Sequence, residues 1–393
     1  MGRAGILHTG KFQNCSHDES LLGAIPFSES ISGHLFFVVC FFALILFDAS
    51  ATRIRARLTL LLAMLAIIAT TIGSVACSLG GFYQSTWFFL QKYIYPIALF
   101  LILANAQLKY LNETIVTIVV IVGMIVGVCG AAPAAVYASH VSSKPLYFPG
   151  VGSINHSAAY ICFAMAALFV AASHLRKEPI PLLSYTMSAA FFMVGFLTRS
   201  RGFILSIAWV AGAYLFLLRG KRALLPEPVL VAGGLVIAFA IAALAFGDAF
   251  SGMWRPGDFF HGRLEIWRDA LTLFSRYPTC GIGLGKFRDT SFNPVYRERG
   301  SGEFFHHGHN IFLNSLAEGG LLLFAAVSAV VVAGVVFLIL SLRINRQSAL
   351  IQLSFMTWGV FCVFGILDDT IVPTLTFVPA ICFGLYFSFT RSA

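Results

Sequence analysis

Long apolar segments separated by short polar connectors dominate the chain. A helix needs about 20 continuous apolar residues to cross a bilayer, so each long segment is a predicted transmembrane helix. Eleven such segments are present: 31–48, 58–77, 89–106, 114–133, 157–173, 180–197, 202–218, 228–246, 318–341, 349–367 and 371–389. The apolar runs are continuous rather than alternating, which excludes an outer-membrane β-barrel. The pattern predicts an all-α polytopic membrane protein with about 11–12 transmembrane helices.

The composition supports this prediction. Hydrophobic residues make up 58% of the chain and charged residues only 11%, whereas about a quarter of a soluble domain is charged. An ordinary soluble enzyme, a disordered chain and a disulfide scaffold are therefore excluded. Lys and Arg outnumber Asp and Glu by 26 to 17, a net charge of +9. In a membrane protein this excess indicates orientation or phosphate binding and does not require nucleic acid.

The distribution of positive charge predicts which connectors face the cytoplasm. Lys and Arg gather in alternate connectors, at 53–57, 176–177, 219–222 and 343–346, and this set is cytoplasmic by the positive-inside rule. The long connector 247–308 then lies on the periplasmic side, as does the N-terminus. We expect a single integral-membrane domain over 1–393, with an N-terminal segment 1–30, a helix set 31–246, the periplasmic loop 247–308 and a second helix set 309–393.

Two arginines follow the sixth apolar segment, on the predicted outer side. The sequence there is Thr198-Arg199-Ser200-Arg201-Gly202. An arginine at membrane depth is costly, and its planar guanidinium suits two-pronged binding of phosphate oxygens. The alternative is that these side chains reach out to lipid headgroups. On a continuous helix positions 199 and 201 diverge, so at most one of the two would face a site.

The periplasmic loop contains a predicted amphipathic helix. Apolar residues repeat at helical spacing through Leu264, Trp267, Leu271 and Phe274, which predicts a short helix lying along the outer membrane surface. Arg263 at its start is a candidate second phosphate clamp, and the alternatives are an ion pair with Glu265 or stacking on Trp267. The following Gly-rich string, 281–285, has no preceding strand, which argues against a dinucleotide or P-loop site and favours close backbone approach.

A histidine cluster precedes the ninth apolar segment. His306, His307 and His309 are followed by a predicted helix on which Asn310, Asn314 and Glu318 form a polar stripe. A position near a helix N-terminus favours a neutral imidazole at His309, which can accept a proton as a general base. A structural role for His309 remains an alternative. A metal site built from the three histidines is also possible, but no partner acid lies nearby in the sequence.

Two adjacent acids, Asp368 and Asp369, stand at the predicted outer end of the last apolar segment. Buried acids at this position are candidates to orient a base or to contact an acceptor. The alternative is that they cap the N-terminus of the last helix.

These motifs, in this order, resemble those of the O-antigen ligase/polymerase superfamily, and most closely the lipopolysaccharide O-antigen ligase branch. The motifs are Ser200-Arg201-Gly202, the loop with Arg263, Trp267 and the Gly-rich string, and His309-Asn310 followed by Glu318-Gly319-Gly320. The resemblance implies a multi-pass protein of the bacterial inner membrane with its active site facing the periplasm. It implies Arg201 and Arg263 as the arginines that bind the donor pyrophosphate and His309 as the base. Asp368 or Asp369 falls where the family often has an acid.

The resemblance also implies a reaction. Members move a glycan from undecaprenyl pyrophosphate to an acceptor, which in the ligase branch is a hydroxyl of the lipid A–core oligosaccharide. We expect His309 to deprotonate that hydroxyl, the arginines to neutralise the leaving group, and direct attack to invert the anomeric centre. No cofactor, metal ion or ATP is expected, and the expected partners are the lipid-linked donor, the lipid A–core acceptor and membrane lipid. An O-antigen polymerase of the same superfamily, and a flippase or transporter of lipid-linked glycans, remain alternatives.

Overall fold

The computed structural model describes residues 89–105, 112–142, 146, 148, 153–175, 180–218, 261–287, 295, 307–369, 371 and 373–392. The predicted apolar segments 31–48, 58–77 and 228–246, the N-terminal segment 1–30 and most of the loop 247–308 lie outside these residues, as does His306.

The described chain is built from helices, and no strand occurs within it. In chain order the elements are the π-helix η2 (Leu90–Ile94) and the α-helices α4 (Tyr95–Asn105), α5 (Glu113–Ser142), α6 (Ile154–His174), α7 (Ile180–Leu197), α8 (Arg201–Leu218), α11 (His261–Arg276), α13 (Ile311–Ile344), α14 (Ala349–Leu367) and α15 (Pro373–Ser392).

The helices confirm the predicted fold class. Each of the eight predicted spans that fall in the described part of the chain coincides with a helix. The helices α5, α6, α7, α13 and α14 are long and apolar enough to cross a membrane, and Lys92–Ala104, Arg201–Leu217 and Leu375–Phe389 form shorter apolar helices. The protein is an all-α polytopic membrane protein.

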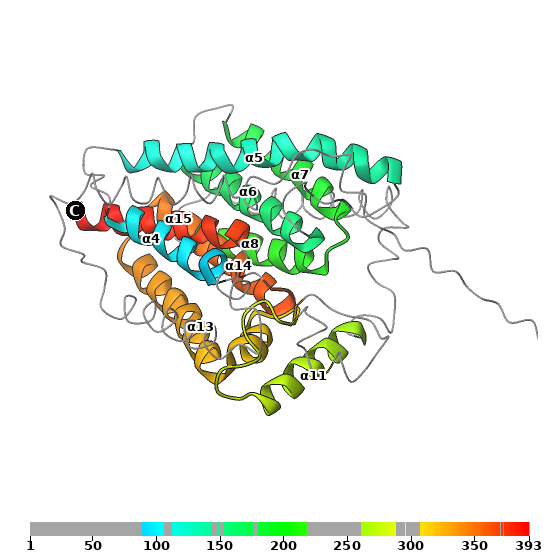
Figure 1. The fold of residues 1–393 in the computed structure, drawn as a ribbon. Helices are drawn as coiled ribbons and strands as arrows, with labels where there is room; N and C mark the ends of the chain where they lie inside the picture. The colour runs from blue at the N-terminus through cyan, green and yellow to red at the C-terminus, as the bar shows by residue number, and fades with distance from the viewer. Residues whose placement is uncertain are drawn as a thin grey trace, which may run out of the picture.

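The helix α6 lies at the centre of the main helix layer and packs against α5, α7, α8 and α14. It is buried along almost its whole length, including its many alanines, because small side chains allow neighbouring helices to approach closely. The helix α5 runs along the outside of this layer (Figure 1) and leaves large apolar residues such as Ile115, Val119 and Val126 exposed. Such a face fits a hydrocarbon environment and needs no protein partner.

A second group of helices carries the loop segment. The helix α4 packs on α15, and α13 packs on α14 and α11. Figure 1 shows α11 on the far side of α13 from α5, at the edge of the helix layer. The arrangement places α11 close to the N-terminal half of α13.

The predicted helix of the loop is present, but the stripe that packs on the protein differs from the predicted one. Ile266, Ala270 and Leu273 are buried against the Gly-rich segment and α13, whereas Leu264 and Leu271 are 53% and 49% exposed. The helix therefore has two apolar faces. The prediction that it lies along the membrane surface places the second face toward lipid, and it stays a prediction.

The Gly-rich string supports a kink in α13, which confirms the expected close approach of two backbones. Gly320 has φ 68° and interrupts the helix, so carbonyls before it need other donors. Ile282 and Gly283 donate their N–H groups to the carbonyls of Ala317 and Glu318, both at 2.9 Å. A Cβ on Gly281, whose φ is 66°, would lie 2.3 Å from the backbone carbon of Glu318. Only glycine fits there.

The two ends of the helix layer differ in their chemistry. At one end, Ser348 bonds the carboxylate of Glu113, Arg346 bonds the backbone oxygen of Phe216, and His174 pairs with Gln352 at 3.0 Å. At the other end, the starts of α6, α8 and α13 meet the end of α14. The predicted arginine and histidine motifs and the paired acids lie at this second end.

Candidate active site

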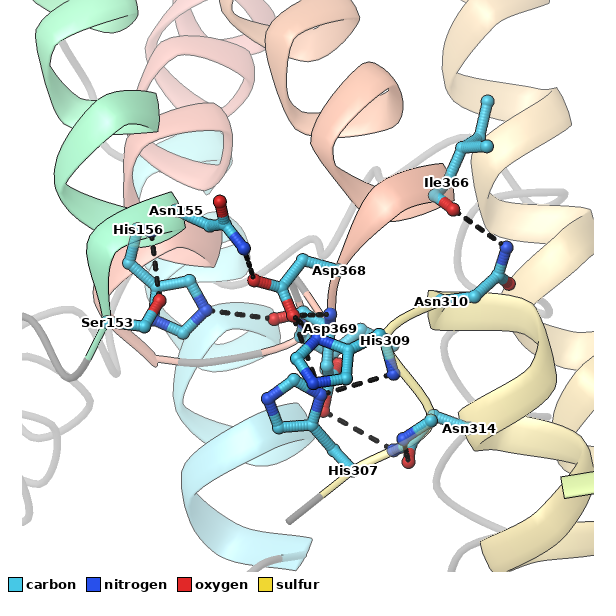
Figure 2. A network of polar contacts seen from close by, with 12 residues as sticks. Ser153, Asn155, His156, His307, His309, Asn310, Asn314, Ile366, Asp368 and Asp369 are labelled. Atoms are coloured by element: carbon cyan, nitrogen blue, oxygen red, sulfur yellow. Dashed lines mark hydrogen bonds and ion pairs between the residues drawn. The ribbon is translucent and has the colours of Figure 1, made fainter. Parts of the chain in front are cut away.

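The turn after α14 is the centre of the polar network (Figure 2). Asp368 ends α14 with its N–H donated to the carbonyl of Phe364 at 2.7 Å. The side chains of Asp368 and Asp369 are only 2% and 3% exposed. Buried carboxylates require partners, and three other segments of the chain supply them: η2, the start of α6 and residues 307–314.

The first partner is His309. Its Nδ1 lies 3.0 Å from Oδ1 of Asp368. A carboxylate only accepts, so Nδ1 carries the proton and donates it, and Nε2 is left with a lone pair. The histidine side chain is 29% exposed, while the acid is buried. The pair can accept a proton at Nε2 and stabilise the resulting positive charge through Asp368.

His309 lies just before the start of α13, as the sequence predicted, but its backbone conformation is unusual. The helix α13 begins at Ile311 with Asn310 as its N-cap, whose side-chain oxygen accepts the N–H groups of Phe312 and Leu313. His309 precedes the cap and has φ 44°, a left-handed conformation that is uncommon for residues other than glycine. Strain of this kind often accompanies functional sites. The side chain is aimed by this turn and by Asp368.

Asn310 therefore does not belong to a polar stripe with Asn314 and Glu318, as the sequence predicted. Its side-chain nitrogen donates to the carbonyl of Ile366 at 2.9 Å, joining the start of α13 to the end of α14 (Figure 2). Asn314 is buried, and its amide nitrogen lies 3.3 Å from both Glu318 and Asp369. Glu318 is also buried and accepts the N–H of Phe287 at 3.4 Å. Asn314 and Glu318 thus connect the network to the Gly-rich segment.

His307 is the second histidine of the cluster. Its Nδ1 accepts the backbone N–H of His309 at 3.2 Å and lies 3.5 Å from Asp368. Burial lowers the pKa of His307 to about 4, with Asp368 opposing the shift and His309 adding to it. Ligand atoms of His307, His309 and Asp368 lie within 4.8 Å of one another. The sequence argument that no acid accompanies the histidines is therefore wrong, because folding brings Asp368 to them, and three ligands for a metal ion are available.

Residues at the start of α6 complete the network, and sequence reasoning missed them. Asn155 donates to Oδ2 of Asp368 at 2.6 Å and accepts the hydroxyl of Ser200 at 2.7 Å. Nε2 of His156 lies 3.1 Å from the carbonyl of Asp369. Ser153 caps the helix by accepting the N–H of His156. The polar run at the start of an otherwise apolar segment was the only sequence signal for these residues.

The arginines occupy different local environments. Arg201 is the first residue of α8, whereas Arg199 lies in the turn before it, with φ 54° and an exposed side chain. The two do not share a continuous helix, so the sequence argument from helical geometry was wrong in its premise. Ser200 of the same turn bonds Asn155, which connects this turn to Asp368.

Arg263 is brought to the same end of the molecule. Burial lowers its pKa, nearby Asp368 opposes the shift and Arg201 adds to it, so the three charged groups interact. Nη1 of Arg263 is buried without a hydrogen-bond partner among the described residues. A buried guanidinium nitrogen of this kind suits an anionic ligand. Trp267, four residues later on α11, is half-buried.

One further cation reaches the paired acids. Nζ of Lys92, in η2, lies 2.7 Å from Oδ2 of Asp369, and the lysine is 9% exposed. Asp368 and Asp369 thus have different partners. The former faces His309 and Asn155, and the latter faces Lys92 and Asn314.

Comparison with known proteins supports the family resemblance. No curated protein matches the chain. Residues 185–328, which include α8, α11, the Gly-rich segment and the first half of α13, match a family described as O-antigen ligase. The match covers Arg201, Arg263 and His309 and confirms the resemblance inferred from the motifs. Residues 185–328 are therefore similar to an O-antigen ligase domain, and this match supports the O-antigen ligase/polymerase superfamily.

Proposed function

We propose that the protein is an O-antigen ligase-type glycosyltransferase. It moves an O-antigen or similar glycan from undecaprenyl pyrophosphate to a hydroxyl of the lipid A–core oligosaccharide, at the periplasmic face of the bacterial inner membrane. The observation that carries the proposal is the His309–Asp368 pair at 3.0 Å, close to the interacting cations Arg201 and Arg263.

The His309–Asp368 pair suits general-base catalysis. Nε2 of His309 accepts the proton of the acceptor hydroxyl as its oxygen attacks the anomeric carbon. Asp368 stabilises the imidazolium formed in this step, because an ionised carboxylate at hydrogen-bond distance favours the charged ring. Burial opposes ionisation of Asp368, but the hydrogen bond from His309 and the neighbouring histidines hold its pKa well below the usual range.

Arg201 and Arg263 suit the stabilisation of the pyrophosphate leaving group. As the new bond forms, the bond between the anomeric carbon and the pyrophosphate oxygen breaks, and negative charge accumulates on undecaprenyl pyrophosphate. Arg201 and Arg263 neutralise that charge. Nη1 of Arg263, which has no hydrogen-bond partner among the described residues, is a donor to phosphate oxygen. Direct attack from the opposite face inverts the anomeric centre, and no covalent enzyme intermediate is required.

The transfer is proposed to be independent of metal ions and ATP. Pyrophosphate is already a good leaving group and two arginines supply positive charge, so neither a Lewis acid nor a nucleotide is needed for the step. Binding of a metal ion by His307, His309 and Asp368 would use the atoms assigned here to the base and its acid. The two roles are therefore mutually exclusive, and a chelator separates them.

The test is transfer by purified protein in nanodiscs, with lipid-linked glycan as donor and lipid A–core as acceptor. We expect glycan on lipid A–core, and a loss of about 10²–10⁴-fold in the single-turnover rate of His309→Ala. Donor affinity should change little, because the arginines supply it.

His174→Ala is the matched control, because His174 pairs with Gln352 at the opposite end of the helices. Lengthening of the lipid-linked glycan without transfer to lipid A–core would instead identify a polymerase. Transport of the donor without transfer would identify a flippase. A wild-type rate in His309→Ala would contradict the base assignment.

A further inference from the structure

Lys92 stands at an unusual point of the fold. It is 9% exposed in the π-helix η2 that leads into the apolar helix α4. The N–H of Tyr95 bonds the carbonyl of Leu90, five residues earlier, so this turn is wider than an α-helical turn. Single π-helical turns occur frequently at functional sites. A lysine in an apolar segment of a membrane protein is costly unless it is paired, and it is by default a candidate functional residue.

The surroundings of Lys92 show which group balances its positive charge. It lies at the edge of an apolar cavity that is also lined by Tyr93, Ile97, Val331 and Phe361. Its Nζ is 2.7 Å from Oδ2 of Asp369, and the same oxygen lies 3.3 Å from the side-chain amide nitrogen of Asn314. A buried ion pair of this kind gives little net stability, but removing one partner leaves a costly uncompensated charge. The charge of Lys92 is therefore matched to Asp369.

Asp369 in turn restrains the side chain of Asp368. Its backbone N–H donates to Oδ1 of Asp368 at 2.9 Å, and that oxygen is the one that accepts Nδ1 of His309. Its other carboxylate oxygen accepts the N–H of Ile371 at 3.1 Å. Fixing the Asp369 side chain thus fixes the peptide group that holds the Asp368 carboxylate toward the histidine.

We infer that Lys92 is a positioning residue for the proposed transfer: by pairing with Asp369, it holds the turn that aims Asp368 at His309. The inference rests on the proposed function for its kinetic consequence, but the geometric consequence for His309 is independent of it. Two other roles are distinguishable from this one. A lysine that contacts substrate would act without Asp369, and a lysine needed only for folding would change stability and leave His309 unaffected.

The kinetic test compares Lys92→Met with the double variant Lys92→Met/Asp369→Asn. The single variant leaves the Asp369 charge buried and unpaired, so the turn moves, and the single-turnover rate should fall at least about tenfold at unchanged donor KM. The double variant removes both charges and should recover several-fold over the single variant. Val331→Ala changes the wall of the same cavity without a charge and is the control.

The second readout does not depend on glycan transfer. Diethyl pyrocarbonate modifies a neutral imidazole nitrogen, and the rate at His309 can be followed by peptide mass spectrometry. Lys92→Met should change this rate at least about threefold, in the same direction as Asp368→Asn, while His174 is modified as in the wild type.

A wild-type modification rate at His309 in a folded Lys92→Met protein would overturn the inference. So would a double variant that transfers no faster than the single variant, because Lys92 would then act without Asp369. Absence of transfer by the wild-type protein would refute the proposed function, and the modification assay would still decide the role of Lys92.

Discussion

Asp368→Asn is the substitution that isolates the charge of the acid from its shape. Oδ1 of Asp368 faces two donors, Nδ1 of His309 and the N–H of Asp369, whereas among the described residues Oδ2 faces only Asn155. In Asp368→Asn, the side-chain amide nitrogen should therefore take the place of Oδ2. Asn155 can accommodate it by turning its own amide. The hydrogen bond to His309 is kept, and the negative charge is lost.

The expected magnitude follows from this geometry. A hydrogen bond to a charged group contributes about 1.5–3 kcal/mol and a neutral one about 0.5–1.5 kcal/mol, so the loss is about 1–2 kcal/mol. Since about 1.4 kcal/mol is a factor of ten in rate, Asp368→Asn should transfer glycan roughly tenfold more slowly than the wild type. His309→Ala removes the base itself and should lose about 10²–10⁴-fold.

The measurement is the single-turnover rate of both variants at several pH values between about 5.5 and 8. The pKa of Asp368 is held well below its usual range. A carboxyl with a depressed folded-state pKa keeps its contribution above the unfolded value near 3.9 and loses it only at lower pH. Asp368 itself should thus stay ionised over this range, so that its own protonation does not change the ratio of wild-type to Asp368→Asn rates. A variant as slow as His309→Ala, or one at the wild-type rate, would refute the reasoning.

Four further predictions test other parts of the proposal. An impermeant maleimide should label Ser301→Cys with the inner membrane sealed, because 247–308 is predicted to be periplasmic; labelling only after that membrane is opened would contradict the topology. Arg201→Lys should reduce transfer more than Arg199→Lys, because a two-pronged phosphate contact is lost at Arg201 and Arg199 is exposed; equal tolerance would favour lipid headgroup contacts. Excess EDTA should leave transfer unchanged, and loss restored by a divalent ion would instead support a metal ion in the histidine cluster. Because the pKa of His307 is lowered to about 4, protonation favours the unfolded state, and stability in detergent should fall by up to about 3 kcal/mol between about pH 6.5 and 4. Thermal unfolding of the wild type and His307→Asn checks this, and equal pH dependence in both would contradict it.

The membrane helices could be predicted because their signal is local. A continuous apolar run of sufficient length has few other structures available in a bilayer, so each predicted span in the described chain is a helix. The face of α11 could not be predicted in the same way. Both Leu264 and Ile266 belong to plausible apolar stripes, and only packing against the Gly-rich segment and α13 selects Ile266.

The site was predictable where a polar residue interrupts an apolar pattern at a helix end. Arg201, His309 and Asp368 could be found in this way, and the fold brings them to one end of the molecule. Their partners could not be identified, because the contacts join distant segments. Asn155 and Asp368 are 213 residues apart, and Lys92 and Asp369 are 277 apart. No periodicity in the sequence encodes such pairs.

The backbone conformation at Asp368 directs the two adjacent acids toward different partners. Asp368 has an extended backbone, with φ −156° and ψ 172°, and successive side chains of an extended chain point in opposite directions. One acid therefore faces His309 while the other faces Lys92 and Asn314. A helical turn would have separated the two side chains by only about 100° around the helix axis, which brings the like charges closer together. Ending α14 immediately before the pair lets one acid serve the histidine and the other anchor the turn in the helix layer.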